Sequence, residues 1–229
     1  VVVAIENLLK ARAVAQASVD AYRKLGVQVA SAYAKHLLFP QQHGYDVFSS
    51  ELCVVEDAYY NGDYLDSDIL DAVIQVKAIT NRYMMADAVV TATIDNPEDV
   101  TARIVGQASF ENNSYAPFWE ASPLPGTVNN ALEFYNVNFN LSHVLYGMPA
   151  GTYRLHTHAF YRCGDKADNP IQRNAKLYIL HSSGVESEAE IMAISDDPTD
   201  KKGDGNWYAY NGVYVPDNMQ SASVSIDEF

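Results

Sequence analysis

The first third of the chain has the three-and-four spacing of apolar residues that is typical of amphipathic helices. The longest such stripe is made of Ile5, Leu8, Ala15, Val19, Tyr22, Val29 and Tyr33. Pro40 and Gly44 follow it, so this pattern predicts a long helix that ends after Leu38.

Two shorter helices are predicted next. One covers 48–60 and ends at Asn61 and Gly62, which are common residues at a helix C-terminus. The other begins at Asp66 or Ser67, either of which can cap it. Its inner stripe is Ile69, Val73, Val76, Thr80 and Tyr83. Three helices with short connections predict an up-down-up bundle over residues 1–92.

After Thr91 the apolar spacing changes to the two-residue period of β-strands. Strands are predicted at 101–105, 132–144, 152–162, 174–181, 189–194 and 207–215. Gly147 to Gly151 has the composition of a tight turn, so the runs on either side predict a hairpin. Alternate residues of these runs should form a buried face, namely Val137, Phe139, Leu141, Tyr153, Leu155 and Thr157. Strands without intervening helices predict an antiparallel β-sandwich over 93–229.

Charge narrows the range of partners. The chain carries 29 acidic and 15 basic residues, for a net charge of −14. Nucleic acids and anionic membranes need a basic surface, so neither is an expected partner. No stretch reaches the roughly 18 apolar residues of a membrane span, so no transmembrane segment is expected. Sixteen tyrosines are typical of all-β domains and of surfaces that bind polar ligands.

No sequence motif indicates a reaction, because the G-x-S-x-G, phosphate-loop and C-x-x-C patterns are missing. His156 and His158 could share a metal if a third ligand converged, but surface histidines are the more common explanation. Cys53 and Cys163 lie 110 residues apart and are expected to be buried free thiols, with a disulfide between them as the less favoured alternative. The Asp-rich stretch 195–206 lacks the spacing of a calcium loop and predicts a solvated loop. Paired carboxylates of a glycosidase remain an open alternative.

Several short blocks occur in the order seen in one family. They are Ala-Ser-Phe-Glu at 108–111, Trp119, Glu-Phe-Tyr-Asn at 133–136, Gly-Met-Pro-Ala-Gly-Thr-Tyr-Arg at 147–154, Phe-Tyr-Arg at 160–162 and Ala-Lys-Leu-Tyr at 175–178. From about residue 95 onward the chain resembles the galactose-binding-domain-like β-sandwiches of secreted or surface-anchored proteins from Bacteroidetes-type bacteria. These resemble carbohydrate-binding modules and commonly follow a helical segment. Such sandwiches host many functions, so the resemblance bears on fold more than on activity.

The chain departs from this family in two places. Gln107 and Ala108 stand where the family has Asn-Pro, and the family continues with further strands beyond the counterpart of Phe229. The resemblance therefore implies a jelly-roll sandwich with three open explanations for its end: the last strands are missing, or they belong to another part of a longer protein, or the family alignment does not hold at this end of the chain.

The resemblance also implies site residues. Aromatic rings would stack on sugars while charged groups bind hydroxyls, at Trp119, Glu133, Tyr135, Arg162, Trp207 and Tyr208. Trp207 is the ring that we most expect to be exposed. Glu111 would be a ligand of a structural calcium. In the alternative interpretation Trp119, Phe134 and Tyr161 are core residues, and Glu133 and Arg162 form a structural pair.

These observations predict an α+β protein with two domains, secreted or on the outer cell surface. The leading hypothesis is noncatalytic glycan binding, weak and multivalent, next to other domains of a larger polysaccharide-handling protein. The second hypothesis is a structural or protein-interaction spacer without a sugar site. An enzyme has the least support. A contiguous exposed group of aromatic residues would favour the first hypothesis, and a large apolar patch with every aromatic buried would favour the second.

Overall fold

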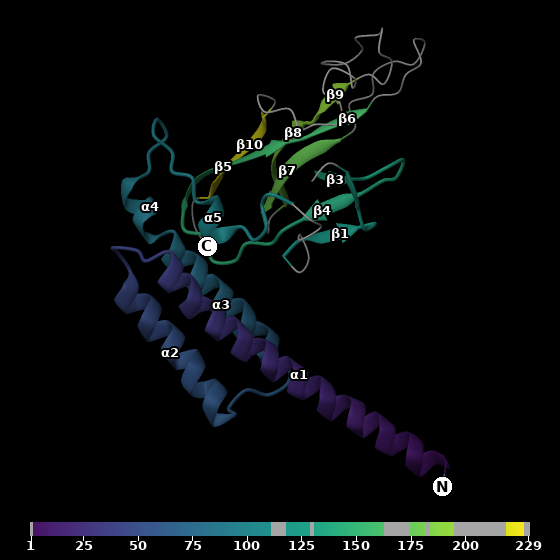
Figure 1. Cartoon of the computed structure of the whole chain (residues 1–229). Helices are drawn as coiled ribbons and strands as arrows, with labels where there is room; N and C mark the ends of the chain where they lie inside the picture. The colour runs from purple at the N-terminus through teal and green to yellow at the C-terminus, as the bar shows by residue number, and fades with distance from the viewer. Residues whose placement is uncertain are drawn as a thin grey trace. The chain divides into compact units, whose positions relative to one another are not determined.

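The computed structural model describes residues 2–110, 118–128, 131–162, 175–181, 184–194 and 219–226. It is a mixed α+β protein with a helical N-terminal part and small sheets, most of them antiparallel (Figure 1). Two compact units can be distinguished. The helical unit takes in residues 1–106 and 143–149, and the strand unit takes in 107–142 and 150–228.

The three predicted helices are confirmed as α1 (Val2–Leu38), α2 (Tyr45–Asn61) and α3 (Ile69–Met84). All three pack on one another. Their core is formed by Leu25, Val29, Ala32, Phe48, Leu52, Val55, Ile69, Val76, Ile79 and Met84. At the end of α2, the left-handed backbone of Gly62 lets its N–H bond to the carbonyl of Tyr59, as the Asn-Gly signal predicts.

Only the second half of α1 contributes to this core. The connection between α2 and α3 reaches α1 at Ser18, which donates to Asp66, and at Tyr22, which donates to the carbonyl of Tyr64. Residues 3–17 of α1 are all exposed. The prediction of one continuous inner stripe is therefore wrong for its first half, because α2 and α3 do not extend far enough to cover it.

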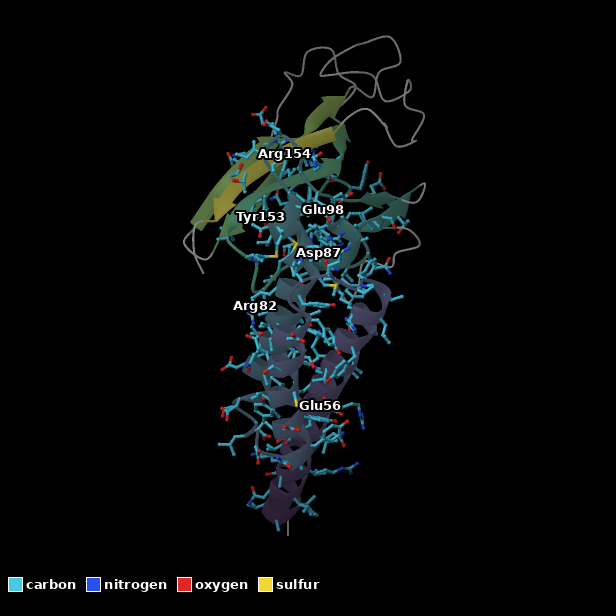
Figure 2. The ribbon with its side chains drawn as sticks, turned by 90° about the vertical axis from the view of Figure 1, so that its left-hand side faces the viewer. Glu56, Arg82, Asp87, Glu98, Tyr153 and Arg154 are labelled. Carbon is cyan, nitrogen blue, oxygen red and sulfur yellow. The ribbon has the colours of Figure 1, made fainter. Side chains whose placement is uncertain are left out.

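Asp87 holds the connection between α1 and α2. It lies in α4 (Ala86–Thr91), and its carboxylate accepts the backbone N–H groups of Gln42 and His43 at 2.9–3.0 Å. The ring of His43 approaches the same carboxylate at 2.8 Å. Partial burial raises the pKa of Asp87, which is labelled in Figure 2, but these hydrogen bonds outweigh it, so the pKa lies below its ordinary value.

Replacing Asp87 with asparagine should lower the free energy of unfolding by about 1 kcal/mol at neutral pH, because an amide oxygen is an uncharged and weaker acceptor. A carboxyl whose pKa is lowered in the folded state stabilises the fold above its unfolded pKa, near 4. This stability is lost as the pH falls through the folded value. Chemical denaturation should therefore give a constant difference between wild type and variant above about pH 5 and a shrinking one below about pH 4. A difference that stays constant down to about pH 3 would contradict this role of the charge.

The strand predicted at 101–105 is wrong, because the chain forms the short helix α5 (Thr101–Ile104) there. Local polar contacts explain the difference. The carboxylate of Asp99 accepts the N–H of Thr101 at 2.9 Å, and Arg103 pairs with Glu98 at 2.6 Å. These contacts favour one helical turn and let Ile104 be buried in the helical unit.

The hairpin predicted around 147–151 is also wrong. Residues 143–149 belong to the helical unit, where Asn81 of α3 donates to the carbonyl of Tyr146 at 2.9 Å and Met148 is buried. The strands on either side pair elsewhere. β4 (Asn140–Ser142) pairs with β1 (Glu120–Ser122), and β5 (Gly151–His158) pairs with β10 (Met219–Ile226).

The remaining pairs of the strand unit are short. The antiparallel ones are β2 (Gly126–Val128) with β3 (Ala131–Glu133), and β7 (Lys176–His181) with β8 (Gly184–Glu190). The parallel pair is β6 (Phe160–Arg162) with β9 (Met192–Ile194). β10 also contacts β7 and β8, so these four strands β5, β7, β8 and β10 lie together.

The predicted strands compare unevenly with the observed ones. The strand at 174–181 is present as β7 with a shifted start. Each of the other three covers parts of two observed strands: 132–144 covers β3 and β4, 152–162 covers β5 and β6, and 189–194 covers the end of β8 and β9. The strand predicted at 207–215 lies outside the described residues. The alternation predicted for β5 is confirmed, since Tyr153, Leu155 and Thr157 are half-buried and Arg154 and His156 are exposed. Burial raises the pKa of Tyr153 to about 12.

Candidate functional site

The candidate site is the aromatic loop, residues 134–139, which connects β3 to β4 with the sequence Phe-Tyr-Asn-Val-Asn-Phe. Tyr135 is 72% exposed and Phe139 44% exposed, and Val137 between them is exposed as well. The sequence pattern placed Val137 and Phe139 on a buried strand face. That prediction is wrong, because the chain leaves β3 before it reaches them and forms a loop.

Two features shape the aromatic loop. The backbone at Asn136 is left-handed, with φ 52°, a conformation that asparagine tolerates better than most residues. The rings of Phe134 and Phe139 are stacked, with centroids 4.2 Å apart and planes at 11°. Phe134 is half-buried, so it supports the more exposed Phe139. Stacked pairs of this kind contribute about 0.5–1.5 kcal/mol beyond the area that they bury.

The end of the loop is held within the strand unit. Tyr178 of β7 donates its hydroxyl hydrogen to the side-chain oxygen of Asn140, the first residue of β4, at 2.5 Å. At the other end, Glu133 closes β3 and pairs with Gly126 of β2. The exposed rings therefore extend from a loop that is anchored at both ends, which keeps them at a defined place on the surface.

The chemistry of this loop combines apolar rings with polar groups. Tyr135 offers a ring face and a hydroxyl, and the exposed Asn136 and Asn138 offer amide donors and acceptors. Glu133 is half-buried at the base of the loop. Such a surface suits a ligand with both C–H faces and hydroxyl groups, because a ring covers the former and amides bind the latter.

Comparisons with protein-family models, with curated protein sequences and with solved structures find no match. Function must therefore be argued from this chain alone. Among the helices in the described part of the chain, none combines the length and apolar character that crossing a membrane requires.

Trp119 lies apart from the aromatic loop. It packs edge-to-face on Phe110, with ring centroids 5.0 Å apart, and it is half-buried. Trp119 directly precedes Glu120, and Glu120 pairs with Ser142 at the C-terminal end of β4. The aromatic loop leads into the N-terminal end of β4, at Asn140. A three-residue strand of about 10 Å separates the two ends. Of the predicted site residues, Glu133 and Tyr135 thus lie at or beside the aromatic loop, and Trp119 lies beside the opposite end of β4.

The other predicted site residues cannot be placed beside these. Arg162 is the last residue of β6, but its side chain is outside the described part. Trp207, Tyr208 and Glu111, the residue predicted to bind calcium, lie outside the described residues, as does Cys163. Their roles, and the structural calcium, stay predictions.

In the sequence, a shared metal is the less common explanation of the pair His156 and His158. Within the described residues, no group of three His, Cys, Asp or Glu side chains is arranged to hold a metal ion. Cys53 is exposed on α2, so the prediction that it is buried is wrong. The negative charge of Asp57 raises the pKa of the Cys53 thiol, which disfavours the reactive thiolate.

Sequence reasoning named Tyr135 as a candidate, a role that stays a prediction, but missed the Phe134–Phe139 pair and the exposure of Val137. One signal could have indicated them. Asn136 and Asn138 interrupt the apolar run, and asparagine is common in turns and rare in strands. A turn at Asn136 would have left 134–139 outside any strand.

Proposed function

We propose that the chain is a noncatalytic glycan-binding module of a secreted or surface polysaccharide-handling protein, and that the aromatic loop is part of its sugar site. The observation that supports this most is the exposure of Tyr135 and Phe139 on one anchored loop, with Phe139 stacked on Phe134. Exposed aromatic side chains that lie close together on a soluble protein mark interaction sites more often than chance. Polar amides beside the rings favour a ligand rich in hydroxyl groups.

The proposed binding is weak. Each hydrogen bond to a sugar hydroxyl replaces one to water, so its net contribution is about 0.5–1.5 kcal/mol. One or two rings and a few amides then give a dissociation constant on the order of 10⁻⁴ M. Such affinity is useful where the module is tethered to an enzyme or repeated, because linkage raises the effective concentration.

The proposal includes a jelly-roll sandwich of the galactose-binding type for the strand unit. Its support is the antiparallel pairing of β5 with β10 and of β7 with β8, together with the contacts of β10 with both β7 and β8. Trp207, Tyr208 and Arg162 would complete the sugar site in this arrangement, and Glu111 would bind a structural calcium.

Replacing Tyr135 with alanine should abolish retention on the glycan that binds wild type best in a glycan array. The melting temperature should change by less than about 2 °C, because an exposed ring adds little to stability. Tyr60→Ala is the matched control, since Tyr60 is 75% exposed on α2 of the helical unit. It should retain wild-type binding. Equal retention of all three proteins would exclude the aromatic loop as the sugar site.

The second candidate function is a structural or protein-interaction module without a sugar site. The exposed apolar first half of α1 favours it, because residues 3–17 carry Val3, Ile5, Leu8, Leu9 and Val14 in water. If the wild-type protein retains no glycan in a broad array, the structural or protein-interaction function is favoured over glycan binding.

A further inference from the structure

The first half of α1 has no partner within the described residues. α1 is 37 residues long, and it continues past α2 and α3 beyond the point where Ser18 meets their connection (Figure 1). We call residues 3–17 the free half of α1. At about 1.5 Å per residue it extends roughly 22 Å into solvent. A helix of this length with exposed apolar side chains is only marginally stable by itself in water.

The free half shares one face with the rest of α1. Every seventh residue forms two parallel series, Leu8, Ala15, Tyr22 and Val29 in one and Ile5, Arg12, Val19, Gly26 and Tyr33 in the other. Two such series side by side are the pattern of a helix that pairs lengthwise with another helix. The face is apolar throughout, except at Arg12. Apart from Arg12, this apolar face continues from the free half into the packed half.

In the packed half, the same face borders a groove of about 430 Å³ between α1 and α2. Its lining includes Gly26, Val29, Tyr33, Glu56 and Tyr59. α2 approaches α1 closely here, since a Cβ on Gly26 would lie 2.6 Å from the Tyr59 hydroxyl. Tyr33 donates to Glu56, which is labelled in Figure 2, at 2.7 Å, and this places a carboxylate at an otherwise mostly apolar groove.

The charges of the two helices are opposite. α2 contains four acidic residues and no Lys or Arg, whereas α1 contains five basic and two acidic ones in a chain whose net charge is −14. The free half contains two basic residues, Lys10 and Arg12, and one acidic residue, Glu6. An apolar helix with basic residues is the occupant that the groove beside α2 favours, and the free half is such a helix.

We propose that two copies of this chain pair through antiparallel α1 helices, so that the free half of each lies in the α1–α2 groove of the other. A pairing centred on Val19 places Ile5 opposite Tyr33 and Leu8 opposite Ala30 of the second copy. Arg12 then lies opposite Gly26, at the part of the groove that Tyr59 and Glu56 line. In a dimer with this two-fold symmetry, both free halves are covered and both grooves are filled.

The size of the contact is sufficient for a stable dimer. A specific interface needs about 1,000 Å² or more of buried surface. Each copy places a free half of roughly 22 Å in the other's α1–α2 groove, and the two contacts related by the two-fold axis together provide an interface on that scale. A dimer would also present two aromatic loops per particle, and two weak sugar sites bind a polymeric glycan more tightly than one.

The test is sedimentation velocity on the full chain, from about 1 to 100 μM, a range that reports dissociation constants typical of modest interfaces. Wild type should sediment with twice the mass of one chain. Leu8→Asp should shift it to monomer. Val14→Asp is the matched control, because Val14 is 64% exposed against 71% for Leu8 in the same free half, yet lies outside both seven-residue series. It should leave the dimer intact.

A charge reversal tests the register. Arg12→Glu should raise the dimer dissociation constant about tenfold or more. Adding Glu56→Arg should restore most of the lost dimer affinity. The helical circular-dichroism signal of each variant shows whether it is folded. A wild type that is monomeric at the highest concentration would overturn the proposal, as would equal effects of Leu8→Asp and Val14→Asp. Binding of a monomer to anionic vesicles through the free half would also overturn it, in favour of a lipid surface.

Discussion

Replacing Gly147 with alanine should destabilise the helical unit by about 3 kcal/mol, one of the two largest effects that we expect in this chain. Gly147 has a left-handed backbone, with φ 63°, and lies against α3. A Cβ there would lie 2.6 Å from the Cβ, 2.7 Å from the Cα and 2.8 Å from the carbonyl oxygen of Ala78. Two of these are backbone atoms of a packed helix, which cannot move aside cheaply. The variant therefore suffers both backbone strain and a collision.

Gly62→Ala separates these two causes. Gly62 is also left-handed, with φ 72°, but no atom lies within 4 Å of the position that a Cβ would take. It should cost only the backbone strain, about 1 kcal/mol. Thermal melts of the full chain, followed by the helical circular-dichroism signal, should then show a much lower transition for Gly147→Ala than for Gly62→Ala. Equal transitions would mean that residues 143–149 do not pack on α3.

Replacing Val29 with aspartate should cost about 4 kcal/mol, because it places an unpaired charge in the helical core. Val29 is 5% exposed, among the most buried residues of α1. The charge would lie beside Glu56 in the α1–α2 groove, and the repulsion adds to the loss of solvation. For a protein of ordinary stability this change unfolds a large fraction of the helical unit at 37 °C.

Val27→Asp is the control for this prediction, since Val27 is 65% exposed on the same helix. Valine and aspartate have similar helix propensities, so the exposed change should alter stability by about 0.5 kcal/mol or less. Urea denaturation of both variants gives the comparison. If Val29→Asp were as stable as Val27→Asp, the second half of α1 would not be part of a shared core.

The helices could be predicted from the sequence because their signals are local. The spacing of Val76, Thr80 and Tyr83 and the Asn-Gly stop after α2 depend only on neighbouring residues, and all agree with the structure. What the pattern could not show is how far α2 and α3 extend beside α1. The exposure of Ile5 and Leu8 follows from that length, which is a property of the packed unit.

The strands were predicted less well because strand pairing is not local. The glycine-rich run at 147–151 has the composition of a hairpin turn, but Tyr146 and Met148 gain more by packing in the helical unit. β5 then pairs with β10, more than sixty residues later in the chain. At the candidate site, Tyr135 was identified from a resemblance, whereas the stacking of Phe134 on Phe139 depends on a turn at Asn136 that an alternating pattern conceals.

The sugar-binding proposal is tested most directly by following the aromatic ring signals of the full chain by NMR during titration with the glycan that an array selects. A dissociation constant on the order of 10⁻⁴ M gives fast exchange, so ring signals should move progressively and saturate. We expect the signals of Tyr135 and Phe139 to move most and those of Tyr60 on α2 to stay in place. Saturable binding that leaves Tyr135 and Phe139 unmoved would contradict it.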